Sequence, residues 1–188
     1  LRLYEALGVE IATDQARRFA RECHKLSPKL SVGLYTGDDG TENRAMTPDQ
    51  VITHRATLRE NPPDILLTNY KMLDFLMLRP ADQKLWRLNQ AGTLKYLVVD
   101  ELHTFDGAQG TDLACLIRRL KGRLGAAPGQ LVCVGTSATL GDDTGGSGGD
   151  SLLNFARDIF GEAMDADAVI GEDRVSVGDY LAEALVEH

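Results

Sequence analysis

Long hydrophobic runs are absent from this sequence, and cysteine is scarce. The longest uncharged apolar stretches, such as YLVV at residues 96–99, are far shorter than the roughly 20 residues that cross a bilayer, and no charged-then-apolar signal segment opens the chain. The three cysteines, Cys23, Cys115 and Cys133, are widely separated among apolar neighbours. They therefore offer neither a disulfide framework nor a zinc knuckle. We expect a protein of the reducing cytoplasm with no membrane contact.

A phosphate-binding loop of the form G-x-x-x-x-G-K-[ST] is also absent. No lysine in the sequence follows a glycine. Loops of this form cradle the phosphates of ATP with backbone N–H groups and a lysine. The sequence therefore excludes a complete nucleotide site of that kind within this chain.

The composition that remains is that of an ordinary globular protein. Of the 188 residues, 43% are hydrophobic and 26% are charged, which is enough for one domain with a core. The net charge of −8 is unevenly spread: residues 141–188 hold 12 acidic and 2 basic residues (−10), so residues 1–140 keep 18 basic and 16 acidic residues (+2). The first 140 residues can therefore meet an anionic partner such as nucleic acid without net repulsion.

Short β-rich runs alternate with helical patterns over the first 140 residues. Strands are predicted at residues 30–35, 65–68, 96–100 and 131–136. Apolar residues recur at helical spacing between them, as at residues 113–124, whereas residues 1–11 show no clean apolar strand. Strands that read as continuous Val and Leu runs are buried on both faces. The pattern thus predicts an α/β fold, a parallel sheet with helices on both faces.

Two of these strands end in residues suited to chemistry, at the sheet edge where ligands collect. The run YLVV leads directly into Asp100 and Glu101, with His103 shortly after. Such a pair suits a site where Asp100 holds Mg²⁺ through water and Glu101 polarises an attacking water, although a lone acidic pair is more often a polar turn. The run LVCVGTSATL at residues 131–140 places Ser137 and Thr139 after another strand, where they either reach the first site or cap the next turn.

Together the two runs resemble motifs II and III of superfamily two helicases of the DEAD/DEAH-box kind, with D-E-L-H followed by S-A-T across an amphipathic helix. Residues 12–18 (ATDQARR) resemble the end of motif Ia, residues 35–38 (YTGD) motif Ib, and residues 64–70 (DILLTNY) motif Ic. The run at residues 100–110 most resembles the large bacterial helicases of the Lhr-like and YprA-like kind. This resemblance implies a partial RecA-like P-loop NTPase domain that lacks its Walker A loop.

The resemblance also implies a role for each residue of motifs II and III. Asp100 would coordinate the Mg²⁺ of MgATP through water, and Glu101 would position or deprotonate the attacking water, with His103 beside them in the catalytic group. A coupling group would link the nucleotide state to domain closure; it consists of Ser137, Ala138 and Thr139, with His103. ATP and Mg²⁺ are the implied cofactors of the intact protein.

A nucleic-acid surface is implied on the loops of motifs Ia, Ib and Ic. Its residues would be Thr13, Asp14, Gln15, Thr36, Gly37, Thr68 and Asn69. Backbone amides and hydroxyls at helix N-termini bind phosphates without a strongly basic patch, so a near-neutral domain is compatible with this role. The expected partner is single-stranded or duplex DNA, and RNA is the less favoured one.

The chain divides into three parts in this interpretation. Residues 1–140 form the partial RecA-like domain 1, residues 141–150 a flexible Gly-rich loop, and residues 151–188 an acidic helical extension toward a missing second RecA-like domain. Because the P-loop and the second domain are missing, we expect a fragment of an ATP-dependent helicase or translocase that is inactive by itself.

Two other interpretations are open at this stage. One is a catalytically dead helicase-like module that binds nucleic acid or protein. The other is a metal-dependent hydrolase that uses Asp100, Glu101 and His103 directly. Zinc proteases instead need two histidines one helical turn apart, and the sequence has no such pair.

Overall fold

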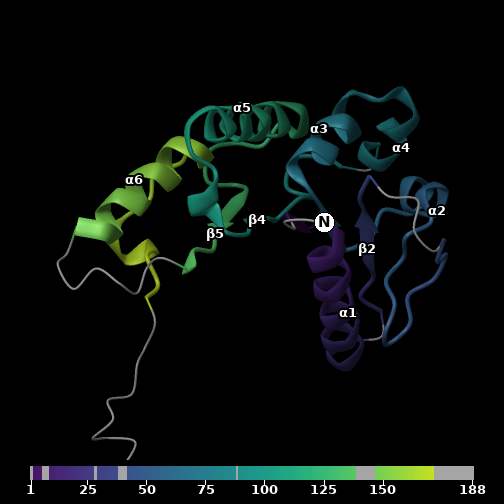
Figure 1. Ribbon diagram of the computed structural model, residues 1–188. Coiled ribbons are helices and arrows are strands. Elements are labelled where there is room, and N and C mark those ends of the chain that lie inside the picture. The colour runs from purple at the N-terminus through teal and green to yellow at the C-terminus, as the bar shows by residue number, and fades with distance from the viewer. Residues whose placement is uncertain are drawn as a thin grey trace, which may run out of the picture.

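The centre of the molecule is a five-stranded sheet with the order β2-β3-β1-β4-β5, in which all neighbours are parallel (Figure 1). The computed structural model describes residues 2–5, 9–27, 29–37, 42–87, 89–138 and 147–171. The strands are β1 (Arg2–Glu5), β2 (Val32–Tyr35), β3 (Ile65–Thr68), β4 (Tyr96–Val99) and β5 (Val132–Gly135). The predicted parallel sheet is confirmed; the strand predicted at residues 65–68 has these bounds, and the other three predicted strands are slightly shorter.

β1 lies in the middle of this sheet, where the sequence predicts no strand. It pairs with β3 on one side and with β4 on the other, so that Leu3 lies opposite both Leu66 and Leu97. The run RLYE is too short for a periodicity to identify it. Its neighbours supply hydrogen-bond partners on both sides, and this tertiary pairing makes it a strand. The interpretation of residues 1–11 as lacking a strand is therefore wrong.

Helices cover both sides of the sheet, as predicted. In Figure 1, α1 (Val9–Leu26) lies on one side, and α3 (Tyr70–Leu78) and α5 (Gly107–Leu124) lie on the other. Shorter elements fill the connections: α2 (Arg55–Glu60), η1 (Pro80–Asp82), α4 (Gln83–Trp86), η2 (Leu102–Thr104) and η4 (Ala166–Ala168). Among the described helices, none has the length and apolar character to cross a bilayer.

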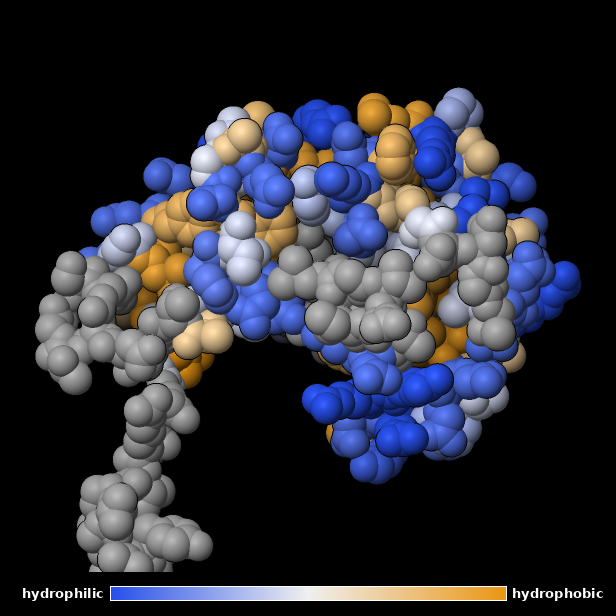
Figure 2. Space-filling view, viewed as in Figure 1, coloured by the Kyte–Doolittle hydropathy of each residue, from blue (hydrophilic) through white to orange (hydrophobic). Residues whose placement is uncertain are grey.

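The side chains of β3 alternate between two hydrophobic clusters. Ile65 and Leu67 pack with Ala16 and Ala20 of α1, whereas Leu66 packs in the larger cluster built on α3 and α5. All four residues of β3 are buried, because successive side chains of a strand point to opposite faces and both faces are covered here. The outward side of α1 is hydrophilic (Figure 2).

The helix α6 (Ser147–Phe160) packs along α5 and does not stand apart from the domain. Its residues Leu153, Ile159 and Phe160 are buried, and Lys121 of α5 forms an ion pair with Glu162 just beyond the helix. The structure thus differs from the predicted boundaries: residues 147–150 start a helix where a flexible loop is predicted, and this helix continues to residue 160 with one face buried against the domain. An amphipathic stripe at this spacing needs an apolar partner, which α5 provides. The rest of the predicted loop (141–146) and the end of the predicted extension (172–188) lie outside the described residues.

The β5 side of the sheet is less well covered than the β2–β3 side. Tyr96 of β4 and Val132 and Val134 of β5 are 39%, 47% and 40% exposed, and Tyr96 lies opposite Val132 in the register. The intervening Cys133 packs against the larger cluster on the opposite face. The molecule is hollowed beside α1 on this side (Figure 2). We call Tyr96, Val132 and Val134 the open β4–β5 face.

Candidate functional site

The acidic pair stands in a tight turn at the carboxyl end of β4. Glu101 has a left-handed backbone with a φ of 50°, and no other non-glycine residue in the described part of the chain has a positive φ. This conformation costs on the order of 1 kcal/mol or more when the residue has a Cβ. The adjoining segment holds it in place: the Glu101 N–H donates to Thr136 Oγ1 (3.0 Å), and the Leu102 N–H donates to the Thr136 carbonyl (2.8 Å). The two turns are so close that a Cβ at Gly135 would lie 2.6 Å from Leu102 Cδ2.

Asp100 is held on both of its carboxylate oxygens. The Thr136 hydroxyl donates to Asp100 Oδ1, and Gln15 Nε2 donates to Asp100 Oδ2 at 3.1 Å. Thr136 follows β5 and Gln15 lies on α1, so two elements far apart in the sequence orient one carboxylate. Gln15, which the sequence assigns to the nucleic-acid surface, is therefore a member of the acidic site.

His103 lies in η2 beside the acidic pair. Its Nδ1 is 3.1 Å from Ser137 Oγ and 3.4 Å from Glu101 Oε2. The side chains of His103 and Glu101 are 29% and 38% exposed, so solvent reaches both. One ring nitrogen thus faces a carboxylate of the β4 turn and a hydroxyl of the segment after β5, which links the two segments.

The structure brings the predicted catalytic residues Asp100, Glu101 and His103 together with Ser137 of the coupling group. Ala138 follows Ser137 in the described chain, and Thr139 lies outside the described residues. Sequence reasoning missed Thr136, the residue with most bonds to the acidic pair. The signal for it is positional: Val99 pairs with Gly135 in the parallel register, so the next residue on each strand comes side by side.

Three of the predicted nucleic-acid residues lie at the same edge of the sheet as the acidic pair. Thr36 and Gly37 follow β2, and Asn69 follows β3; the carboxyl ends of parallel strands share one edge. Asn69 also starts α3, because its Oδ1 accepts a hydrogen bond from the Met72 N–H (2.8 Å). Gly37 is exposed, and Thr36 and Asn69 are half-buried, so a ligand in solution can reach this edge.

The remaining predicted nucleic-acid residues are placed differently. Thr68 is 2% exposed, and its hydroxyl donates to the Tyr35 carbonyl at 2.7 Å, so it stabilises the β2–β3 pair and presents no side chain to a ligand. Asp14 is exposed and pairs with Arg17 of the next helical turn at 3.6 Å. For Thr13 the structure describes only the backbone, which lies within α1.

A buried polar cluster fixes the end of β2, just before the loop at residues 36–37. The Tyr35 hydroxyl donates to Asp82 Oδ1 (2.8 Å), and Arg59 donates to both Asp82 Oδ1 (2.6 Å) and the Tyr35 oxygen (2.8 Å). Burial raises the pKa of Tyr35, and the neighbouring Asp82, which is fully buried, raises that pKa further. Arg55 of α2 also lies 3.4 Å from both carbonyl oxygens of the loop. No sequence pattern identifies these residues, because they come from three separate segments.

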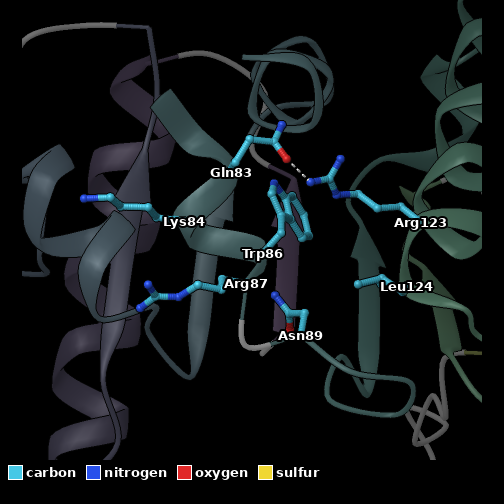
Figure 3. Close-up of a pocket in the computed structure, with 7 residues that line it drawn as sticks. All are labelled: Gln83, Lys84, Trp86, Arg87, Asn89, Arg123 and Leu124. Atoms are coloured by element: carbon cyan, nitrogen blue, oxygen red, sulfur yellow. Dashed lines mark hydrogen bonds between the residues drawn. The ribbon is translucent and has the colours of Figure 1, made fainter. Parts of the chain in front are cut away.

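A pocket between α4 and the last turn of α5 lies away from this site (Figure 3). Its lining residues are Gln83, Lys84, Trp86, Arg87, Asn89, Arg123 and Leu124. Arg123 bonds to Gln83 and to the Met77 carbonyl and lies over the Trp86 ring at 5.7 Å, while Lys84 and Arg87 point away from Trp86 (Figure 3). These contacts join helices α3, α4 and α5, and none of the predicted site residues takes part.

The residues around the acidic pair fit a hydrated Mg²⁺ ion better than a transition metal. Within the described ranges, no three His, Cys, Asp or Glu side chains are placed to hold a metal ion by themselves. Mg²⁺ keeps several waters and binds through one or two carboxylates plus substrate phosphates. An oriented Asp100 meets that requirement, whereas a hydrolase with direct transition-metal ligands would need a fuller ligand set.

Comparison with known proteins agrees with this geometry. A family model described as DEAD/DEAH box helicase matches residues 9–145. The chain is 33% identical over 119 residues to the Druantia protein DruE of Escherichia coli (strain UMEA 4076-1), which covers 60% of this chain and 6% of DruE. It is 31% identical over 134 residues to the uncharacterized ATP-dependent helicase MJ1574 of Methanocaldococcus jannaschii, with 69% of this chain and 18% of that protein covered.

Solved structures of the DUF1998 helicase MrfA have a similar fold. One matches with a TM-score of 0.61 and 25% identity over 86% of this chain and 22% of MrfA. Another, of MrfA bound to DNA, matches with a TM-score of 0.62 and 26% identity over 87% of this chain and 19% of MrfA. The chain therefore spans less than a quarter of each of these relatives. Since the matched region runs through β2 to β5 and includes both segments of the acidic site, the chain belongs to the DEAD/DEAH box helicase family.

Proposed function

We propose that this chain is part of the first RecA-like domain of an ATP-dependent helicase or translocase, and that Asp100 and Glu101 carry ATP hydrolysis. The observation that supports this most is the acidic pair itself, held at the carboxyl end of β4 by Thr136. Asp100 would hold the hydrated Mg²⁺ that accompanies ATP, and Glu101 would orient the attacking water and accept its proton. Transfer of the γ-phosphoryl group to water is the chemistry that bound MgATP supplies.

His103 and Ser137 would report the state of this site to the rest of the motor. A change in the position of Glu101 alters its 3.4 Å contact with His103, and through the ring nitrogen it alters the 3.1 Å contact with Ser137. Ala138 and Thr139 continue from Ser137 along the chain, so this segment would carry the change toward a second RecA-like domain of the same polypeptide.

DNA is the proposed nucleic-acid partner, with RNA less favoured. MrfA, whose DNA-bound structure is similar to this chain, supports DNA. The loop at residues 36–37 and the start of α3 at Asn69 would contact the sugar-phosphate backbone, since both lie at the exposed carboxyl edge of the sheet. Because Thr68 is buried, its part would be to hold the β2 and β3 ends in register. A protein of this kind would act in the cytoplasm.

The phosphate-binding part of the ATP site would come from elsewhere in a longer polypeptide. The chain has no G-x-x-x-x-G-K-[ST] loop, and it spans only 6% and 18% of its curated relatives DruE and MJ1574. The open β4–β5 face is an apolar surface that a further helix would cover, while a further strand would pair with β5 at the end of the sheet. By itself, the chain would hydrolyse no ATP.

An ATPase assay with matched chains tests this function. The chain by itself and the longer polypeptide that contains it are each assayed with and without single-stranded DNA, as wild type and as Glu101→Gln. We expect no hydrolysis by the isolated chain and DNA-stimulated hydrolysis by the longer polypeptide, which Glu101→Gln abolishes. Hydrolysis by the isolated chain that depends on Glu101 would contradict the proposal.

A catalytically dead helicase-like module is the second candidate, favoured by the missing phosphate loop. The reading frame around the gene separates the two: a phosphate loop encoded upstream supports the motor. DNA binding without hydrolysis by the complete gene product would support the dead module.

A further inference from the structure

Gln15 joins α1 to the acidic site across 85 residues of sequence. Its Nε2 donates to Asp100 Oδ2 at 3.1 Å, and the side chain is partly buried between α1 and the turn after β4. Its other polar atom, Oε1, is buried and has no hydrogen-bond partner in the described part of the chain. Burying an amide oxygen without a hydrogen-bond partner is costly, and none of the residues that the structure describes donates to Oε1.

The position of Gln15 Oε1 limits which kinds of hydrogen-bond donor can reach it. Oε1 belongs to the same amide group that holds Asp100, the carboxylate proposed to hold hydrated Mg²⁺. A nucleic-acid phosphate is an acceptor and cannot pair with Oε1, and the Asp100 carboxylate, which is bonded to the same amide group, would repel it. A water on a divalent cation is a donor only, because its lone pair faces the metal.

We propose that Gln15 is a positioning residue of the hydrated cation site. Its Nε2 orients Asp100, and its Oε1 accepts a hydrogen bond from a water held by the divalent cation. This inference rests on the proposed role of Asp100 as the Mg²⁺ ligand. A glutamine suits both tasks because one amide group carries a donor and an acceptor, whereas glutamate or methionine supplies at most one of them.

The consequence is a physical link between α1 and the cation. α1 comes after β1, which ends opposite Thr68 of β3, and Gln15 lies on this helix next to Ala16, which is 3% exposed. A shift of α1 would therefore move the Gln15 amide relative to Asp100. Groups in the shell around metal ligands change metal affinity by about 10- to 100-fold when removed, which sets the size of effect to seek.

The test measures cation binding by the full chain, with NMR signals as the readout. Isotope-labelled protein is titrated with Mn²⁺, whose paramagnetism broadens nearby signals, and separately with hexaamminecobalt(III), which offers only N–H donors and no open coordination position. The signals to follow are the Gln15 side-chain amide and the Leu102 backbone N–H. In the wild type we expect both signals to respond to both probes.

The variants separate a polar role from a packing role. Gln15→Met keeps the side-chain length without polar atoms, and we expect it to bind both probes about 10-fold more weakly or worse. Gln15→Glu keeps an acceptor oxygen and adds negative charge, so it should retain binding of both cations. Gln109→Met, the same change at an exposed glutamine of α5, is the matched control and should bind as the wild type does.

The variant Asp100→Asn distinguishes a failure of the proposed Gln15 role from a failure of the cation site itself. If Asp100→Asn loses Mn²⁺ binding while Gln15→Met binds as tightly as the wild type, the role of Gln15 is overturned and the cation site stands. Unchanged binding by Asp100→Asn, or no response in the wild type at millimolar Mn²⁺, would overturn the cation assignment and with it the inference. If Gln15→Met fails to fold, the wild type decides: a Gln15 side-chain amide signal that stays unchanged with hexaamminecobalt(III) while the Leu102 N–H responds would overturn the role of Gln15.

Discussion

The two halves of the sheet differ in how they are covered, and the acidic site lies on the less covered half. β2 and β3 have helices on both faces, with Val32 and Leu66 fully buried. β4 and β5 carry α5 and α6 on one face only, and their other face exposes Tyr96, Val132 and Val134. The acidic residues therefore lie on the half of the sheet that has one exposed face, next to the surface that a further element would cover.

The largest expected effect is a difference in alkylation rate between two cysteines, Cys133 on the covered side of β5 and the exposed Cys115 of α5. Burial raises the pKa of the Cys133 thiol, Lys121 lowers it by less and Glu162 adds a small rise, which together bring it from 9.0 to about 11. The thiolate fraction near pH 8 then falls by about 100-fold relative to an unshifted thiol, so Cys133 should react with iodoacetamide at least 100-fold more slowly than exposed Cys115. Mass spectrometry of the two peptides measures this. In urea the two rates should converge, and equal rates in the folded chain would show that the covered side of β5 is accessible.

A matched pair of valines compares the two halves directly. Val32→Ala removes a fully buried side chain and should lower the free energy of unfolding by about 2 kcal/mol. Val134→Ala, at 40% exposure in the other half, should lower it by less than about 0.5 kcal/mol. Urea denaturation gives both values. Equal losses would mean that the open β4–β5 face is already covered in the isolated chain.

Thr136 should matter more for the site than its exposed position suggests. Thr136→Val removes the hydroxyl that bonds Asp100 and the Glu101 N–H, and we expect a loss of about 1 kcal/mol in unfolding free energy. Thr136→Ser keeps the hydroxyl and serves as the control. If serine costs as much as valine, the side chain acts through its methyl group and the hydrogen bonds are unimportant.

The smallest expected effect is a gain in stability. Glu101→Gly removes the Cβ from a residue with a φ of 50° and so relieves its backbone strain. After the entropic cost of glycine is subtracted, the free energy of unfolding should rise by about 0.5 kcal/mol, which thermal unfolding measures as a higher midpoint temperature. In the longer polypeptide the same variant would lose ATP hydrolysis. A loss of stability would mean that Glu101 contributes contacts that outweigh its backbone strain.

Much of the fold, and the position of Asp100 and Glu101 at the end of a strand, can be predicted from local sequence. The run YLVV into Asp100 and Glu101 predicts a buried strand with carboxylates at its end, and the spacing at residues 113–124 predicts α5. These signals are strong because burial on both faces or along one helical stripe leaves a periodic apolar pattern. The sequence also placed Ser137 at the end of a second strand, and the pairing of β4 with β5 brings it to His103.

Other features depend on pairing between distant segments. β1 exists because β3 and β4 lie on either side of it, and Thr68 is buried because its hydroxyl meets the Tyr35 carbonyl. α6 joins the core because α5 presents an apolar stripe to it. None of these partners is near in sequence, so no local periodicity records them.

The sequence by itself determined that this is an α/β chain with an acidic pair at a strand end and no phosphate loop, because composition, periodicity and motif spacing are local properties. Only the tertiary structure decided that Thr136 and Gln15 hold Asp100, that Glu101 is kept in a left-handed conformation, and that one half of the sheet is left open. The reason is geometric. Parallel strands bring their carboxyl ends together whatever their separation along the chain, and hydrogen bonds between side chains depend on that register.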